Sequence, residues 1–224
     1  MKIIARIKND FPTKFGIPRQ SGLVDSLKAT IVFEPEFRNA DALRGLENFS
    51  HIWLIWGFSA TVRDVWSATV RPPRLGGNSR MGVFATRSNF RPNAIGLSSV
   101  KLDGIETDEK LGTVLNVSGA DLMGGTPIYD IKPYLPFTDC RTDAVGGFAD
   151  EVKDYALNVI FPEKLAKLLP PEKLQPLKDI LAQDPRPAYQ DDAKRIYGFE
   201  FAGFEIKFAV DKEILTVRDI IKLK

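Results

Sequence analysis

Apolar and polar residues alternate at every second position along much of residues 1–135, which is the period of a half-buried β-strand. Six segments carry this pattern or a short apolar run: Ile3–Ile7, Lys28–Phe33, Ile52–Phe58, Ser98–Ile105, Gly112–Ser118 and Pro127–Ile131. Ile52–Phe58 is apolar on both faces, which predicts a central, buried strand. Asn39 predicts the cap of a short helix over Ala40–Leu46. Many short strands separated by Gly and Pro predict a closed or nearly closed barrel.

The pattern changes near Pro136–Gly147, whose composition is typical of a linker. Beyond it, four leucine and isoleucine residues recur at helical spacing on one face of Glu172–Asp184. The other predicted elements are a strand over Leu157–Phe161, a helix over Glu163–Leu169 and strands over Ile196–Glu200, Phe204–Val210 and Ile214–Ile220. The sequence therefore predicts a mainly β, α+β protein, with a small β-barrel domain over residues 1–139 and a small α+β domain over residues 148–224.

The overall composition is that of a soluble globular protein, with 44% hydrophobic and 27% charged residues among 224. A chain of this length buries roughly 70% of its unfolded surface and needs no covalent or metal cross-link. The single Cys140 and the single His51 exclude an intrachain disulfide, a multi-thiolate zinc site and any site with two imidazoles. No apolar run resembles a signal peptide or a membrane helix. We expect a cytoplasmic protein without a metal.

Basic residues concentrate in the middle of the chain. Residues 65–102 contain no Asp or Glu, although an even spread would put about five there. The basic residues of this segment are Arg71, Arg74, Arg80, Arg87, Arg91 and Lys101. Guanidinium groups bind phosphate or carboxylate through two parallel hydrogen bonds and stack on bases. The alternative is that the fold scatters these side chains among acidic partners.

The long segment Val70–Ser98 combines the arginines with glycines, Phe90 and the amides Asn78 and Asn93. This mixture suits a polyanion with exposed bases, because arginine binds phosphate, phenylalanine stacks and asparagine reads base edges. A rigid structural crossover is the alternative. The earlier loop Gly16–Gly22 could reach a ligand through its Arg and Gln side chains, or it could be an ordinary surface loop.

A third segment, Gly119–Phe137, places two carboxylates nine residues apart around a glycine turn. Asp121 and Asp130 could bind ribose hydroxyls or favour a cation. Alternatively, Asp121 forms an Asx-turn and Asp130 pairs with Lys132 at the surface. No G-x-G-x-x-G motif follows a strand and no P-loop motif is present, so Rossmann-type hydride transfer and P-loop chemistry are disfavoured.

The single His51 precedes the buried strand without an evident catalytic partner, which favours a structural role. Nothing marks Cys140 as a nucleophile, and the tryptophans are interpreted as packing residues. The residues alone therefore predict a β protein that binds a polyanion, and they do not name a reaction.

Four stretches together resemble one protein family. They are PRQ at Pro18–Gln20, ADALRGLENFSHIWLI, VRPPRLGGNSRMGVFATRSNFRPNAIGLS and DLMGGTPIYDIKPYLPF. They are similar to the TrmO family of S-adenosylmethionine-dependent tRNA methyltransferases, which methylate N6 of threonylcarbamoyladenosine beside the anticodon. The stretch DPRPAY, which begins at Asp184, resembles the small C-terminal domain of that family. The resemblance implies a β-barrel methyltransferase that acts as a homodimer.

The resemblance also implies site residues. The S-adenosylmethionine contacts would be Pro18, Arg19, Gln20, Ser59, Ala60, Arg87, Leu97, Asp121, Leu122, Met123 and Gly124. Ser59-Ala60 stands where relatives often have His-Gln, so those positions would contribute through their backbone only. The residues expected to contact tRNA are Arg71, Arg74, Arg80, Phe90, Arg91 and Asn93. The alternative is a non-catalytic RNA-binding barrel whose cofactor site has decayed.

The implied reaction is attack of N6 on a sulfonium methyl group, in which positioning can contribute roughly 7–11 kcal/mol. The N6 proton must leave, and Asp121, Asp130 or water could accept it. Arg91 and Asn93 could orient the threonylcarbamoyl carboxylate and the base edge. The candidate catalytic residues are therefore Asp121, Asp130 and Asn93.

Overall fold

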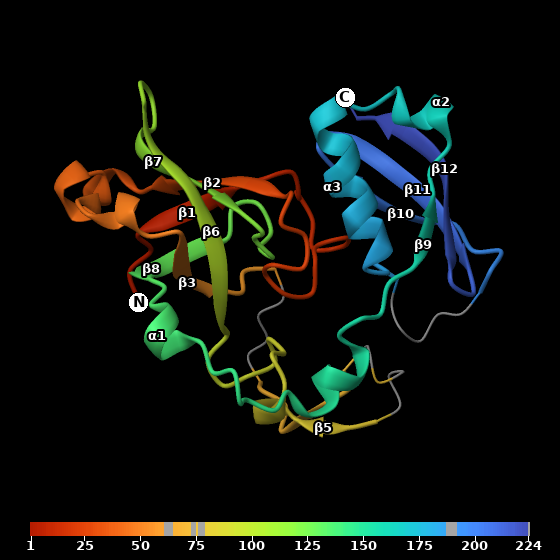
Figure 1. Ribbon diagram of the computed structural model, residues 1–224, viewed down its shortest axis with the longest axis horizontal. Coiled ribbons are helices and arrows are strands. Elements are labelled where there is room, and N and C mark those ends of the chain that lie inside the picture. The colour runs from red at the N-terminus through yellow and green to blue at the C-terminus, as the bar shows by residue number, and fades with distance from the viewer. Residues whose placement is uncertain (61–64, 73–74, 76–78, 187–191, 224) are drawn as a thin grey trace.

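The computed structural model describes residues 1–60, 65–72, 75, 79–186 and 192–223. Six strands form a sheet that closes on itself in the order β1-β2-β7-β6-β3-β8, at the left of Figure 1. Their bounds are β1 Ala5–Lys8, β2 Lys28–Phe33, β3 His51–Gly57, β6 Ile95–Asp108, β7 Gly112–Ser118 and β8 Pro127–Pro133. Each neighbouring pair is antiparallel, and the pairing of β1 with β8 closes the barrel.

The apolar and polar residues that alternate along the sequence face the inside and the outside of the barrel in turn. In β1, Ala5 and Ile7 are buried, whereas Arg6 and Lys8 are exposed. The inward-facing side chains of the six strands form one core, with Ile31, Leu54 and Leu115 fully buried. The six predicted strands are therefore confirmed, as is the mainly β, α+β fold class, although β6 is longer than Ser98–Ile105.

The predicted helix over Ala40–Leu46 is wrong in type and extent. Asn39 does act as a cap, because its side chain accepts a hydrogen bond from the Asp41 N–H. The chain then makes two 3-10 turns, η2 Ala40–Leu43 and η3 Leu46–Asn48, after η1 Pro35–Phe37. Gly45 lies between them with φ 90°, a left-handed conformation that ends one turn and starts the next.

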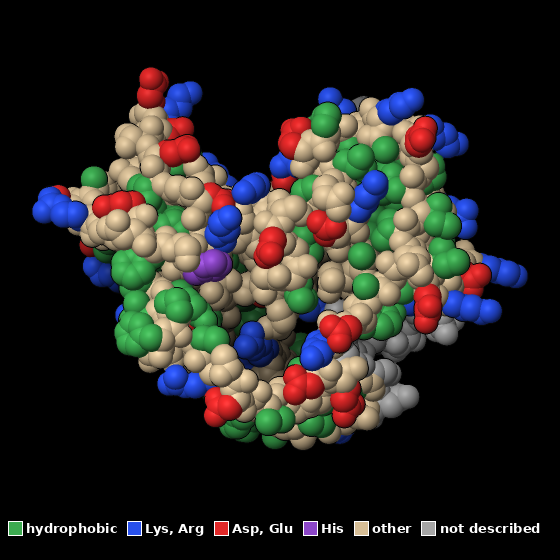
Figure 2. Space-filling view, in the orientation of Figure 1, with side chains coloured by type: hydrophobic (Ala, Val, Ile, Leu, Met, Phe, Trp, Pro, Cys, Tyr) green, Lys and Arg blue, Asp and Glu red, His purple; other side chains and the backbone are tan. Residues whose placement is uncertain are grey.

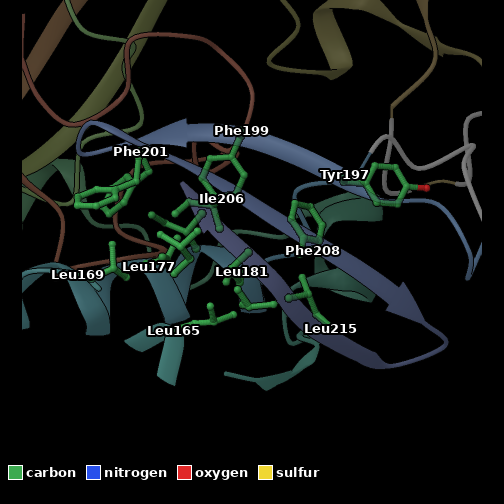
Figure 3. Packing of buried hydrophobic residues seen from close by; sticks show 14 of the residues in the cluster. Leu165, Leu169, Leu177, Leu181, Tyr197, Phe199, Phe201, Ile206, Phe208 and Leu215 are labelled. Atoms are coloured by element: carbon green, nitrogen blue, oxygen red, sulfur yellow. The ribbon is translucent and has the colours of Figure 1, made fainter. Parts of the chain in front are cut away.

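The C-terminal part forms a four-stranded sheet in the order β10-β11-β12-β9, at the right of Figure 1. The strands are β9 Asn158–Ile160, β10 Tyr197–Phe201, β11 Phe204–Asp211 and β12 Ile214–Lys222, and the helices are α2 Glu163–Ala166 and α3 Pro171–Ala182. The predicted apolar face of α3 is confirmed, because Leu177, Ile180 and Leu181 are buried and Leu174 packs against the same core. Figure 3 shows the α3 leucines facing the aromatic side chains of β10 and β11.

The loop between β1 and β2 joins the two parts of the molecule. Its Phe11, Val24 and Leu27 belong to the same hydrophobic cluster as the C-terminal sheet. The rings of Phe11 and Phe201 lie 5.4 Å apart, and Gly16 packs so closely on Phe199 that a Cβ there would come within 2.4 Å of the ring. The C-terminal sheet therefore fixes the loop that contains Pro18, Arg19 and Gln20.

The remaining elements are short. The predicted linker contains α1 Pro136–Asp139 and is followed by η6 Gly147–Val152. Residues 65–102, called the arginine-rich segment below, contain two short strands. Here β4 Thr69–Val70 pairs with β5 Met81–Gly82, and η5 Val83–Ala85 follows. Within the described ranges, none of the helices has the length and apolar character to span a membrane.

Candidate functional site

A cavity of about 660 Å³ lies at one end of the barrel. Four parts of the chain line it: the β1–β2 loop, β3 with the residues after it, residues 86–97, and the loop after β7. This volume falls in the range of small-molecule and cofactor sites. Figure 2 shows the surface hollowed between the barrel and the segment that carries β5, with Lys or Arg side chains beside the hollow.

The cavity brings together most of the residues that the resemblance assigned to the cofactor. Those that line it are Pro18, Arg19, Gln20, Ser59, Ala60, Arg87, Leu97, Asp121 and Met123. Leu122 instead points into the barrel core, and the Gly124 N–H donates to the Phe11 carbonyl over 2.8 Å. These two residues therefore anchor the Asp121 loop and lie outside the lining.

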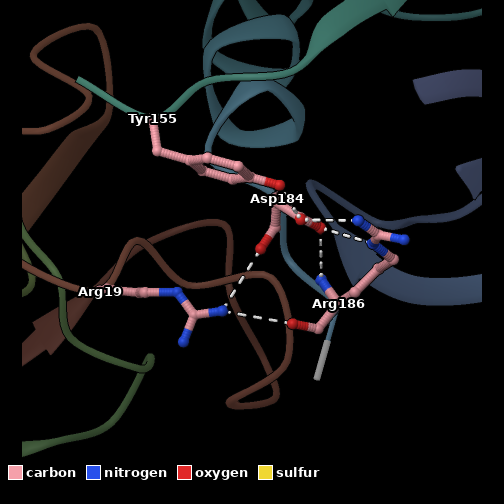
Figure 4. Close-up of polar contacts among 4 residues, drawn as sticks. All are labelled: Arg19, Tyr155, Asp184 and Arg186. Atoms are coloured by element: carbon pink, nitrogen blue, oxygen red, sulfur yellow. Dashed lines mark hydrogen bonds and ion pairs between the residues drawn. The ribbon is translucent and has the colours of Figure 1, made fainter. Parts of the chain in front are cut away.

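Arg19 is held by the C-terminal domain. Its Nη2 lies 3.4 Å from the Asp184 carbonyl oxygen and 3.2 Å from that of Arg186 (Figure 4). The side chains of Asp184 and Arg186 form an ion pair with a 2.9 Å contact, and Tyr155 donates to the same carboxylate over 2.8 Å. Next to Arg19, Gln20 accepts a hydrogen bond from Arg87.

Asp121 contributes the carboxylate of the cavity. Its Oδ1 accepts a hydrogen bond from the Ser98 hydroxyl over 2.5 Å, and Ser98 Oγ accepts one from the Trp56 indole N–H over 2.9 Å. Burial raises the pKa of the Asp121 carboxyl above its ordinary value, although the Ser98 hydroxyl, the main-chain N–H groups of Asp121 and Ser21, and the charge of Arg87 act against the rise.

Basic residues outnumber acidic residues in the described lining of the cavity. Within the described part of the chain, the lining contains four cations and one carboxylate: Lys14, Arg19, Arg87, Arg91 and Asp121. The walls are apolar and aromatic where Trp56, Phe58 and Leu97 lie. Such a site suits a ligand that carries an aromatic base, an anionic group and a cationic group.

Two predicted catalytic residues lie outside this lining. Asp130 forms an ion pair with Lys132 at 2.9 Å, which is the surface pair considered as the alternative above. Asn93 is exposed, and its carbonyl accepts the Ile95 N–H over 2.8 Å. The structure thus brings Asp121 alone, of the three candidates, to the cavity.

The predicted tRNA contacts divide in the same way. Phe90 and Arg91 line the cavity, and Arg91 Nη1 donates to the Val83 and Thr86 carbonyls over 3.0 and 2.6 Å. Arg71 and Arg80 are exposed outside the lining. Arg74 lies outside the described residues.

Sequence reasoning missed Trp56 and Ser98. The sequence predicts a packing role for Trp56 and assigns no function to Ser98. They are 42 residues apart, and only the pairing of β3 with β6 brings them together. His51 lies outside the cavity lining, where its Nδ1 is 2.9 Å from Ser50 Oγ.

Among the residues that the structure describes, no group of three or more His, Cys, Asp or Glu side chains could hold a metal ion. The cavity fits S-adenosylmethionine by chemistry. Aromatic side chains could cover the adenine, guanidinium groups could pair with the carboxylate, and Asp121 could face the cationic part.

The closed barrel and its arginine-lined cavity define a β-barrel protein with a nucleotide-sized binding site. The chain belongs to the tRNA-methyltransferase O family: the N-terminal domain of that family matches residues 6–140, and the TrmO C-terminal domain matches residues 154–223.

Individual relatives agree with this membership. The chain is 42% identical over 215 residues to the tRNA (adenine(37)-N6)-methyltransferase of Escherichia coli (strain K12), covering 92% of this chain and 91% of the relative. It is 45% identical to the enzyme of that name from Eikenella corrodens over 79% of this chain and 99% of the relative. The crystal structure of TrmO from Pseudomonas aeruginosa superposes with a TM-score of 0.76 and 33% identity, covering 97% and 96% of the two chains.

Proposed function

We propose that the protein transfers a methyl group from S-adenosylmethionine to N6 of adenosine 37, beside the anticodon of tRNA, and that the adenosine carries a threonylcarbamoyl group. The observation that carries the proposal is the cavity itself. It joins nine of the residues expected to contact the cofactor, together with Phe90 and Arg91, which were expected to contact RNA. The relatives named tRNA (adenine(37)-N6)-methyltransferase support the same reaction.

The protein's own groups divide the work of the reaction. When bound, S-adenosylmethionine supplies a methyl group on a sulfonium, whose sulfur leaves as a neutral thioether. The Asp121 carboxylate accepts the N6 proton, because Asp121 is the only acidic residue among the described residues that line the cavity. Arg19 and Arg87 hold the cofactor carboxylate, with Arg19 fixed by the C-terminal domain.

The RNA base enters from the side of the arginine-rich segment in this proposal. Phe90 stacks on the base, and Arg91 pairs with the carboxylate of the threonylcarbamoyl group. Holding N6 in line with the methyl group would contribute roughly 7–11 kcal/mol, which is the gain of well-oriented reactants. We also propose that the protein acts in the cytoplasm as a homodimer, with its two domains spanning residues 1–139 and 148–224.

Nucleoside mass spectrometry tests the reaction. The full chain is incubated with methyl-labelled S-adenosylmethionine and tRNA that carries threonylcarbamoyladenosine, and tRNA without that modification is the control. The proposal predicts label on N6 of the modified adenosine alone. Binding of tRNA without any transfer would contradict it and would favour a non-catalytic RNA-binding barrel, for which the exposed Ser59-Ala60 pair would be the cause.

A further inference from the structure

The hydroxyl group of Ser98 is buried and contacts two residues that line the cavity, Asp121 and Trp56. Ser98 is 1% exposed, on the inner side of β6. It bonds to Asp121 on one side and to Trp56 on the other. A buried hydroxyl group can simply fill space in the core. The direction of its hydrogen bonds shows whether it also acts on the Asp121 carboxylate.

The donors and acceptors fix that direction. An indole N–H can only donate, so Ser98 Oγ must be the acceptor from Trp56. The hydroxyl has one hydrogen, and Asp121 Oδ1 is the acceptor 2.5 Å away. A hydrogen bond to a carboxylate is stronger than one to a neutral carboxylic acid, so this bond stabilises the ionised form of Asp121.

The sheet register explains why Trp56 reaches Ser98. Trp56 on β3 lies directly opposite Gly96 on β6, and Ser98 is the diagonal neighbour on the same face. A Cβ on Gly96 would lie 2.2 Å from the Trp56 ring, so the indole crosses the space that a side chain would fill. Gly96 thereby allows the indole N–H to reach the hydroxyl.

We propose that Ser98 and Trp56 are positioning residues that orient the Asp121 carboxylate and hold it ionised as the proton acceptor of methyl transfer, an inference that rests on the proposed function. Neither residue needs to touch the reacting atoms. The charged groups that line the cavity with Asp121 are Lys14, Arg19, Arg87 and Arg91. Arg87 is the one that lowers the pKa of Asp121. The wild type and the Ser98 variants contain the same four residues, so the effect of their charges on the pKa of Asp121 cancels when the variants are compared with the wild type.

Titration of Asp121 in the cofactor-free protein is the primary test. Aspartate carboxyl carbons are labelled with ¹³C, and the Asp121 signal is assigned by its loss in Asp121→Asn. Ser98→Ala should raise the pKa of Asp121 by about one unit, because it removes a hydrogen bond to a charged group. Trp56→Phe keeps an aromatic ring but removes the indole N–H that bonds to Ser98, and it should give a smaller rise. Ser98→Thr keeps the hydroxyl and should restore the wild-type value.

A neighbouring serine provides the matched control. Ser99 follows on the same strand with its side chain on the opposite face, so Ser99→Ala should leave the titration unchanged. An Asp121 pKa that is equal in Ser98→Ala and in the wild type would overturn the proposal. If Ser98→Ala does not fold, the same result from Trp56→Phe, with no rise above the Ser99→Ala value, would overturn it.

The second readout is the acid limb of the pH dependence of kcat. Asp121 accepts a proton only when it is ionised. A higher pKa of Asp121 should therefore move the acid limb to higher pH by the same number of pH units as the pKa rises. A carbon signal that moves while the limb stays fixed would show that Asp121 is not the proton acceptor. If the wild type transfers no methyl group while the carbon signal still moves, the proposed function is overturned and the orienting role of Ser98 is supported.

Discussion

The exchange of Asp184 for Asn perturbs the contact between the C-terminal domain and the cavity. The Asp184 carboxylate receives Arg186 Nε and Nη2, each over 2.9 Å, and the two side chains are only 14% and 10% exposed. Removing one partner of a buried ion pair costs about 3–5 kcal/mol. Asn keeps the shape and tolerates the φ of 51° at this position, so we expect the lower end, about 3 kcal/mol.

Thermal unfolding measures this loss. In a protein of this size each kcal/mol shifts Tm by about 2–4 °C, which predicts a fall of about 6–12 °C. The carbonyl oxygens that hold Arg19 belong to the same turn, so the Kd for S-adenosylmethionine should rise about tenfold. Asp41→Asn is the matched control, because the Asp41–Arg44 pair is 72% and 80% exposed and should contribute less than about 1 kcal/mol.

Acid titration adds a second signature to this variant. Burial raises the pKa of the Asp184 carboxyl, but the hydrogen bonds from Arg186 and Tyr155 and the charge of Arg186 outweigh it and leave the pKa below its ordinary value. The stability that this group contributes is therefore present above its unfolded pKa and is lost as the pH falls through its folded pKa. Asp184→Asn should lack that part of the acid loss. A Tm equal to that of the control variant would refute the reasoning.

Three further variants test the packing and the RNA side of the cavity. Gly96→Ala drives a methyl group against Trp56, so we expect a loss of about 1–3 kcal/mol in urea unfolding, and unchanged stability would contradict the close approach. Phe11→Ala removes a side chain that is 1% exposed at the shared core and should cost about 3–5 kcal/mol, whereas Phe137→Ala, at an 84% exposed position, should cost little in calorimetry. Arg91→Ala should lower methyl transfer while the Kd for S-adenosylmethionine changes little, and equal losses in both would count against its assignment to RNA.

Much of the fold follows from local patterns in the sequence. Strands such as Lys28–Phe33 were predictable because one face of each must be apolar, and Asn39 was predictable as a cap because its side chain accepts a nearby N–H. The helix after Asn39 was not predictable in its extent, because the left-handed Gly45 interrupts it. The shared core of Phe11 with Phe201 could not be inferred, since the two are far apart along the chain.

The candidate site was predictable where contiguous motifs form it. The residues Pro18–Gln20 and the Asp121 loop carry their own turn residues, and both line the cavity. Asp130 lies outside the cavity lining, because two carboxylates at a short spacing can face different directions once one of them lies in a strand. Trp56 and Ser98 depend on the register between β3 and β6, which only the closed barrel fixes.

The central claim is that this cavity holds the cofactor beside the target base. A crystal structure of the full chain with S-adenosylhomocysteine, the product form of the cofactor, tests it most directly. We expect the ligand to lie between the Pro18–Gln20 loop and the Asp121 loop, with its carboxylate within hydrogen-bond distance of Arg19 or Arg87. Ligand density elsewhere on the protein, with this cavity filled by solvent, would contradict the claim.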